Sequence, residues 1–71
     1  MNQMELIKIN TEYITLQQFL KITDFISSGG AAKYYLMDHA VYVNGELEQR
    51  RGRKLYSGYK IQINKREFEI Q

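Results

Sequence analysis

Residues 41–54 read VYVNGELEQRRGRK, and apolar residues occupy alternate positions from Val41 onward. Such a period of two is typical of a half-buried β-strand. Asn44-Gly45 can adopt positive φ at both central positions of a type I′ turn, which joins two antiparallel strands directly. The stretch therefore predicts a β-hairpin, with Leu47 on its return strand.

Four cations follow this hairpin within five residues, with only Gly52 between them: Arg50, Arg51, Arg53 and Lys54. Like charges at this density repel one another, so the fold has to hold them together at a cost. An anionic partner would explain why the chain carries such a segment, which we name the basic loop (residues 50–54).

The size and composition of the chain exclude several classes of protein. With 71 residues, folding buries only about 60% of the surface that the unfolded chain exposes, and we expect one domain over residues 1–71. Cysteine is absent and His39 is the only histidine, so we expect no disulfide, no metal site and no cofactor. The sequence has no signal-like or membrane-spanning apolar run. We expect a soluble, cytoplasmic protein that does not bind membranes.

The net charge of +2 conceals an asymmetry along the chain. Residues 1–49 carry three cations and six acids, a net charge of −3, whereas residues 50–71 carry seven cations and two acids, a net charge of +5. A basic pole of this kind is the electrostatic footprint of a polyphosphate binder, which points to nucleic acid. The alternative is a solvated basic surface without a partner, because such surfaces are common on small domains.

The N-terminal part predicts a short strand and a helix. Residues 4–9 read MELIKI and alternate well enough for a strand. Thr15 with Gln18 three residues later fits a capping box, and the apolar residues that follow recur at helical spacing. A first helix is therefore predicted from Leu16 to about Ile22.

A second short helix is predicted after Ser28, which is a natural N-cap, with Gly29 and Gly30 opening the first turn. Its apolar face has the spacing i, i+3, i+4: Ala32, Tyr35 and Leu36. His39 lies where this helix should end, a position at which chains often turn through positive φ. We interpret His39 as a helix terminus on the surface, because no Cys or second His completes a catalytic or metal site.

Residues 54–63 predict one further strand, followed by a turn near Asn64-Lys65 and a final strand at residues 67–70 with Phe68 and Ile70 on one face. Helices followed by a run of antiparallel strands indicate the α+β class. We expect two short helices packed against a small, mostly antiparallel twisted sheet.

These patterns together resemble the S4 RNA-binding domain, with residues 16–63 as the matching core. The hairpin VYVNG fits the V-x-V-N-G pattern of that family, and further positions match in register: Leu16, Phe19 and Leu20 in the first helix, Ser28, Ala32, Lys33 and Leu36 in the second, and Leu55, Gly58 and Ile61 downstream. The chain looks most like the short, stand-alone members of the family. The resemblance implies an S4-like fold and binding to structured RNA, either ribosomal or ribosome-associated.

Two positions differ from the family pattern, since Thr15 and Gly29 stand where the family usually has arginine. The resemblance therefore assigns more of the RNA contact to Lys33 and to the basic loop. If the hairpin carries this loop next to the second helix, as the S4 arrangement implies, the two elements form one concave basic surface.

The candidate RNA-binding residues follow from the chemistry of phosphate and base recognition. Backbone N–H groups at a helix N-terminus favour anions, and arginine offers planar forks for phosphate or for stacking on an unpaired base. An exposed tyrosine beside a lysine could contact a base. The candidates are Ser28, Gly29, Gly30, Lys33, Tyr34, Arg50, Arg51, Arg53 and Lys54. The alternative for the two glycines is a flexible link between the helices.

Two functions of different classes remain open. The first is a non-catalytic RNA-binding protein. The second is a protein-interaction adaptor that uses its sheet edge or the basic loop against an acidic protein partner. We expect no enzyme, because the sequence offers no nucleophile and base, no paired carboxylates and no set of metal ligands.

Overall fold

The computed structural model describes residues 3–71, which form two α-helices, one 3-10 turn (η1) and seven strands. In chain order these elements are β1 (Met4–Ile7), β2 (Tyr13–Thr15), α1 (Leu16–Ile22), η1 (Gly29–Ala31), α2 (Ala32–Asp38), β3 (Val41–Val43), β4 (Glu46–Leu47), β5 (Lys54–Tyr56), β6 (Lys60–Ile63) and β7 (Arg66–Ile70).

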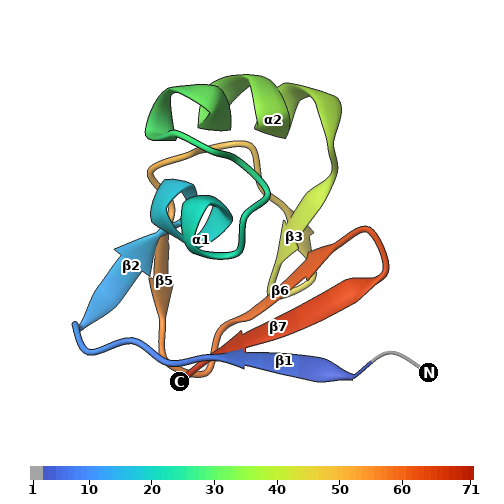
Figure 1. Ribbon diagram of the computed structural model, residues 1–71. Helices are drawn as coiled ribbons and strands as arrows, with labels where there is room; N and C mark the ends of the chain where they lie inside the picture. Colours follow the sequence, from blue (N-terminus) through green and yellow to red (C-terminus); the bar gives the residue numbers. More distant parts are fainter. Residues whose placement is uncertain (1–2) are drawn as a thin grey trace.

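The strands form two sheets. The larger has five strands in the order β1-β7-β6-β3-β4, and all of its pairs are antiparallel except β1 with β7. The smaller is the antiparallel pair β2-β5. Figure 1 shows α2 across the top of the molecule and α1 between α2 and the strands. The predicted α+β fold, with two short helices on a mostly antiparallel sheet, is confirmed.

The core lies where the helices meet the inner faces of both sheets. The period of two in β3, β6 and β7 buries one side of each strand, and the helices add their apolar stripes; the fully buried large side chains are Leu16, Phe19, Leu20, Leu36, Val41, Val43, Leu55, Ile61, Ile63, Phe68 and Ile70. The rings of Phe19 and Phe68 meet edge to face, with centroids 5.1 Å apart. This contact fixes α1 against β7, because inclined aromatic pairs add directional attraction to burial.

The predicted limits of the first helix are confirmed, and so is its capping box. The Thr15 N–H donates to Gln18 Oε1 at 2.8 Å, and the Gln18 N–H donates to Thr15 Oγ1 at 3.2 Å. The second helix differs from the prediction in how it starts. It begins as the turn η1, and Ser28, at the N-cap position, makes no side-chain capping bond. His39 ends α2 on the surface as expected, but its φ is −130°, so the chain leaves the helix directly into extended backbone.

Residues 54–63 form two strands, where a single strand was predicted. Gly58 has a φ of 91° and turns the chain between β5 and β6. Strand β5 lies outside the large sheet and pairs with β2, a strand that was not predicted from the sequence. The register is Tyr13↔Tyr56, Ile14↔Leu55 and Thr15↔Lys54. Three residues are too few to show an alternation, and their partner lies about forty positions away in the chain.

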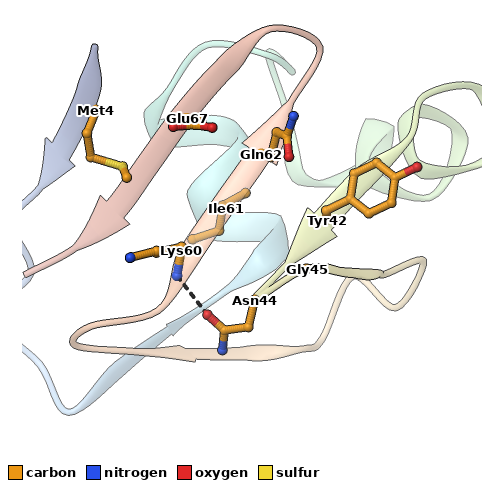
Figure 2. A pocket seen from close by; sticks show the side chains of 8 residues that line it. All are labelled: Met4, Tyr42, Asn44, Gly45, Lys60, Ile61, Gln62 and Glu67. Atoms are coloured by element: carbon orange, nitrogen blue, oxygen red, sulfur yellow. Dashed lines mark hydrogen bonds between the residues drawn. The ribbon is translucent and has the colours of Figure 1, made fainter. Parts of the chain in front are cut away.

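Asn44 joins the predicted hairpin to the neighbouring strand. Asn44 and Gly45 have φ of 51° and 86°, as the type I′ turn requires. The Asn44 N–H donates to Lys60 O at 2.8 Å, and Asn44 Oδ1 accepts from the Lys60 N–H at 2.9 Å. Figure 2 shows the second of these bonds at the start of β6. One asparagine therefore forms the turn of β3-β4 and sets the register of β3 with β6.

We expect Asn44→Ala to lower the free energy of unfolding by about 2 kcal/mol, because alanine is strained at positive φ and cannot replace the side-chain acceptor. Asn44→Gly relieves the strain and loses only the acceptor, so it should cost about 1 kcal/mol. Urea denaturation followed by circular dichroism measures both. An Asn44→Ala protein within about 0.5 kcal/mol of wild type would contradict this account of the turn.

Candidate nucleic-acid interface

Glu48 is the buried anchor of the basic loop. The residue is 5% exposed, although it lies directly after the hairpin at the start of a surface segment. Its carboxylate accepts bonds from Arg50 Nε at 3.0 Å, Arg50 Nη2 at 3.0 Å and Arg53 Nη1 at 2.8 Å, and the Arg50 N–H donates to it at 3.0 Å. No sequence pattern singles out Glu48, because ion pairs in irregular backbone have no fixed spacing.

These bonds change the acidity of Glu48. The Arg50 guanidinium, with smaller contributions from the Arg50 N–H and from Arg53, lowers the pKa of Glu48 from 4.5 to about 2, against the opposing effect of burial. The carboxylate is therefore ionised at every physiological pH. It offsets part of the repulsion among the four cations and fixes two of their side chains.

The backbone of the basic loop is fixed by the first turn of α1. The Leu16 N–H donates to Arg53 O at 2.8 Å, and the Gln17 N–H donates to Arg51 O at 2.9 Å. The first N–H groups of a helix have no partner within the helix, so the loop carbonyls satisfy them. These donors are therefore not free for an anion, and it is the loop side chains that remain at the surface.

Three cations of the loop are exposed, namely Arg50, Arg51 and Lys54, while Arg53 is half-buried. Arg51 and Lys54 form no salt bridge within residues 3–71, in contrast to Arg50 and Arg53. Arg51 and Lys54 are thus the cations of the basic loop whose charge is available to a partner without competing with Glu48.

The segment from Ser28 to Tyr34 also contacts the first turn of α1, through Gly29. A Cβ placed on Gly29 would come within 2.5 Å of Gln17 Nε2, so the glycine lets this segment pack against the Gln17 side chain. The first hydrogen bond of η1 runs from the Ala31 N–H to Ser28 O at 3.1 Å. The N–H groups of Gly29 and Gly30 precede this bond in the chain and are not used by the turn itself. Gly30 is exposed, and Gly29 is half-buried.

Gln17 therefore contacts both the basic loop and the start of the second helical segment. Its N–H donates to the loop, and its side chain packs against Gly29. Lys33 and Tyr34 follow on α2, where both are exposed, Tyr34 to 66%. Figure 1 shows the chain of the basic loop passing between α1 and the start of the second helical segment. The basic loop and the Ser28–Gly30 turn therefore both contact the first turn of α1 at Gln17.

Two hollows of similar size differ in charge. The larger, about 510 Å³, lies on the outer face of the five-stranded sheet, where its lining includes the cation Lys60 and the carboxylate Glu67 (Figure 2). The smaller, about 440 Å³, lies beside the basic loop, and we name it the tyrosine-cation hollow after its lining residues Arg50, Gly52, Arg53, Lys54, Tyr56 and Tyr59. The smaller hollow suits an anionic ligand better, because its charged groups all have one sign.

Sequence reasoning missed the tyrosines of this region. Tyr56 lies between two other rings, with centroid distances of 5.6 Å to Tyr13 and 5.6 Å to Tyr59. Lys54 Nζ is 4.9 Å from the Tyr13 centroid, and Arg53 Cζ is 5.8 Å from the Tyr59 centroid. The only signal in the sequence was the spacing of Tyr56 and Tyr59 directly after the basic loop, since Tyr13 reaches them only through the β2-β5 pairing.

Within residues 3–71, no three side chains of histidine, cysteine, aspartate or glutamate gather closely enough to hold a metal ion. None of the helices described there has the length and apolar character needed to cross a bilayer.

We expect Glu48→Gln to lower the free energy of unfolding at pH 7 by about 2 kcal/mol, because it leaves Arg50 and Arg53 without their counter-charge. The lowered pKa of Glu48 alone corresponds to about 3 kcal/mol, and solvent around the exposed Arg50 reduces the effect. Glu46→Gln, at an exposed position on β4, is the control and should cost less than about 0.5 kcal/mol.

The pH dependence of stability gives a second test of the ion pairs that Glu48 forms with Arg50 and Arg53. A lowered pKa stabilises the fold fully above the ordinary value of 4.5, and this contribution is lost as the pH falls toward 2. The difference between wild type and Glu48→Gln, measured by urea denaturation, should be constant above pH 5 and shrink below pH 4. A difference that is absent at pH 7, or that grows in acid, would contradict the assigned role of Glu48.

Comparison with known proteins agrees with this geometry. A sequence model described as the S4 domain matches residues 7–71. A Bacillus subtilis (strain 168) protein named probable ribosome maturation protein RlbA is 58% identical over 57 residues, which cover 80% of this chain and 80% of that relative. The match to the S4 domain model includes the hairpin, helix and strand patterns that resembled the S4 family. The chain belongs to the S4 domain family.

Proposed function

We propose that this protein is a non-catalytic RNA-binding protein that recognises structured RNA, either ribosomal RNA or RNA associated with the ribosome. Residues 1–71 act as one S4-like RNA-binding domain in this proposal. The RNA lies against a basic surface formed by the basic loop and the start of the second helical segment, both of which contact Gln17.

The observation that carries the proposal is the way in which the fold holds the basic loop. Four cations are concentrated beside the N-terminus of α1, whose dipole is also positive, and this arrangement is costly without a compensating anion. Glu48 supplies only one negative charge, mainly to Arg50 and Arg53. Arg51 and Lys54 keep an uncompensated charge, which an RNA backbone would neutralise.

The surface suits the backbone of RNA rather than the edges of paired bases. Arg51 and Lys54 reach phosphate oxygens as a planar fork and a point charge, respectively. The N–H groups of Gly29 and Gly30, with Lys33 one turn later, add donors where this turn meets Gln17. Proteins that contact RNA in this way recognise the shape of an A-form helix and its loops, since the deep major groove hides the base edges.

The ribosome as the site of action is supported by the relative from Bacillus subtilis, whose name describes a probable role in ribosome maturation. High identity over most of both chains makes a shared role the simplest expectation for this protein. We therefore place the protein in the cytoplasm, with ribosomal RNA or a ribosome-assembly particle as its partner.

We expect Arg51→Gln/Lys54→Gln to weaken binding to ribosomal RNA fragments at least tenfold at about 0.1 M salt, because each neutralised phosphate contributes to affinity through counterion release. The logarithm of affinity against the logarithm of salt concentration should become shallower by about 1 to 2 units. These two positions are chosen because changes at Arg50 or Arg53 would also remove the bonds to Glu48. Filter binding across a salt series measures both quantities.

Lys60→Gln/Lys65→Gln is the matched control, because it removes the same charge from β6 and from the turn after it. The control should bind nearly as wild type does. If both double variants weaken binding equally, net charge alone would account for the affinity and the basic loop would not be the site. If the wild type binds no RNA at low salt, the proposal fails, and the alternative of an adaptor for an acidic protein becomes the one to test.

A further inference from the structure

Three tyrosine rings form a continuous group on the outer side of the small sheet. The pairing of β2 with β5 places Tyr13 opposite Tyr56, while Ile14 and Leu55 point to the core from the same strands. Adjacent rings are inclined at 50° for Tyr13 and Tyr56, and at 61° for Tyr56 and Tyr59. Tyr13 and Tyr56 lie on the opposite face of the pair, where Tyr13 is exposed and Tyr56 is half-buried.

Arg53 adds a planar cation to this group. Its Nη1 donates to Glu48 Oε1 at 2.8 Å, and its Cζ lies 5.8 Å from the centroid of the Tyr59 ring. The carboxylate and the ring restrict the guanidinium, while 24% of the side chain stays exposed. A guanidinium that is fixed in this way offers a flat surface on which an unpaired nucleobase can stack.

The rim of the tyrosine-cation hollow carries the charges that a nucleotide needs beside its base. Arg50 and Lys54 are exposed there, and Lys54 Nζ lies 4.9 Å from the Tyr13 ring. Proteins hold single-stranded nucleic acid with this combination, in which aromatic or guanidinium planes receive bases and neighbouring cations follow the backbone. A paired base in a helix could not enter the hollow, since its faces are already stacked.

We propose that the tyrosine-cation hollow takes one unstacked nucleobase, so that the RNA bound by this protein carries a bulged or single-stranded nucleotide next to its helical part. This inference rests on the proposed function and deepens it by naming the class of RNA. The phosphates on either side of the extruded nucleotide lie against Arg50 and Lys54 at the rim of the hollow, and the base lies between Tyr56 and the plane of Arg53.

The test uses two RNA hairpins that differ only in one bulged 2-aminopurine, whose fluorescence falls when the base stacks. Wild type should bind the bulged hairpin about tenfold more tightly than the fully paired one, the factor that corresponds to 1.4 kcal/mol, with a decrease in fluorescence. Tyr56→Leu should reduce this preference below about threefold, because leucine keeps the bulk and removes the ring. Tyr56→Phe keeps the ring and should behave as wild type.

Tyr42→Leu is the control, since Tyr42 is an exposed tyrosine on the outer face of the large sheet, and it should leave the preference unchanged. Circular dichroism verifies that each variant is folded. Equal affinity of wild type for the two hairpins, or a full preference retained by Tyr56→Leu, would overturn the inference and leave the proposed function standing. If wild type binds neither hairpin at low salt, the proposed function falls, and the inference falls with it.

Discussion

A buried carboxylate makes the basic loop of this protein possible. Glu48 lies under the loop and accepts four hydrogen bonds from Arg50 and Arg53. Without this anion, the loop would place four cations beside the positive end of α1 with nothing to offset their repulsion. The bonds to Glu48 also restrict the side chains of Arg50 and Arg53 before a ligand binds. Less side-chain conformational entropy is therefore lost on binding.

The loop, the small sheet and the start of α1 form one structural unit. Thr15 pairs with Lys54 in the last rung of β2-β5 and also caps the helix that begins at Leu16. The next two N–H groups, those of Leu16 and Gln17, donate to the carbonyls of Arg53 and Arg51. The backbone bonding of the small sheet thus continues without interruption into the helix N-terminus. This continuity holds the cations at a fixed distance from the Gly29 turn, whose packing against Gln17 completes the candidate surface.

The sequence predicted those features whose signals are local. Three predicted features depend on residues within a few positions of one another, and all three are present: the Asn44-Gly45 turn, the capping box of Thr15 and Gln18, and the alternation around Phe68. The β2-β5 pair was missed because neither strand is long enough to show a period, and because Gly58 divides what looked like one strand. Long-range pairing of short segments leaves almost no trace in a single sequence.

The candidate site shows the same division between local and distant signals. Charge alone identified the basic loop, because four cations in five residues are visible without any structure. The roles of its members could not be separated, since the contacts of Arg50 and Arg53 with Glu48 depend on the path of an irregular loop. The contact between Tyr13 and Tyr56 could not be predicted, because it depends on the pairing of β2 with β5, two strands too short to show a period.

The central claim is that RNA lies on the surface that joins the basic loop to the Gly29 turn. The most direct measurement is a titration of the ¹⁵N-labelled protein with a structured fragment of ribosomal RNA, followed through the backbone amide signals. We expect the largest shifts at Gln17, in residues 29–33 and in the basic loop. Shifts concentrated instead at Tyr42, Gln62 and Glu67, on the outer face of the large sheet, would contradict the account.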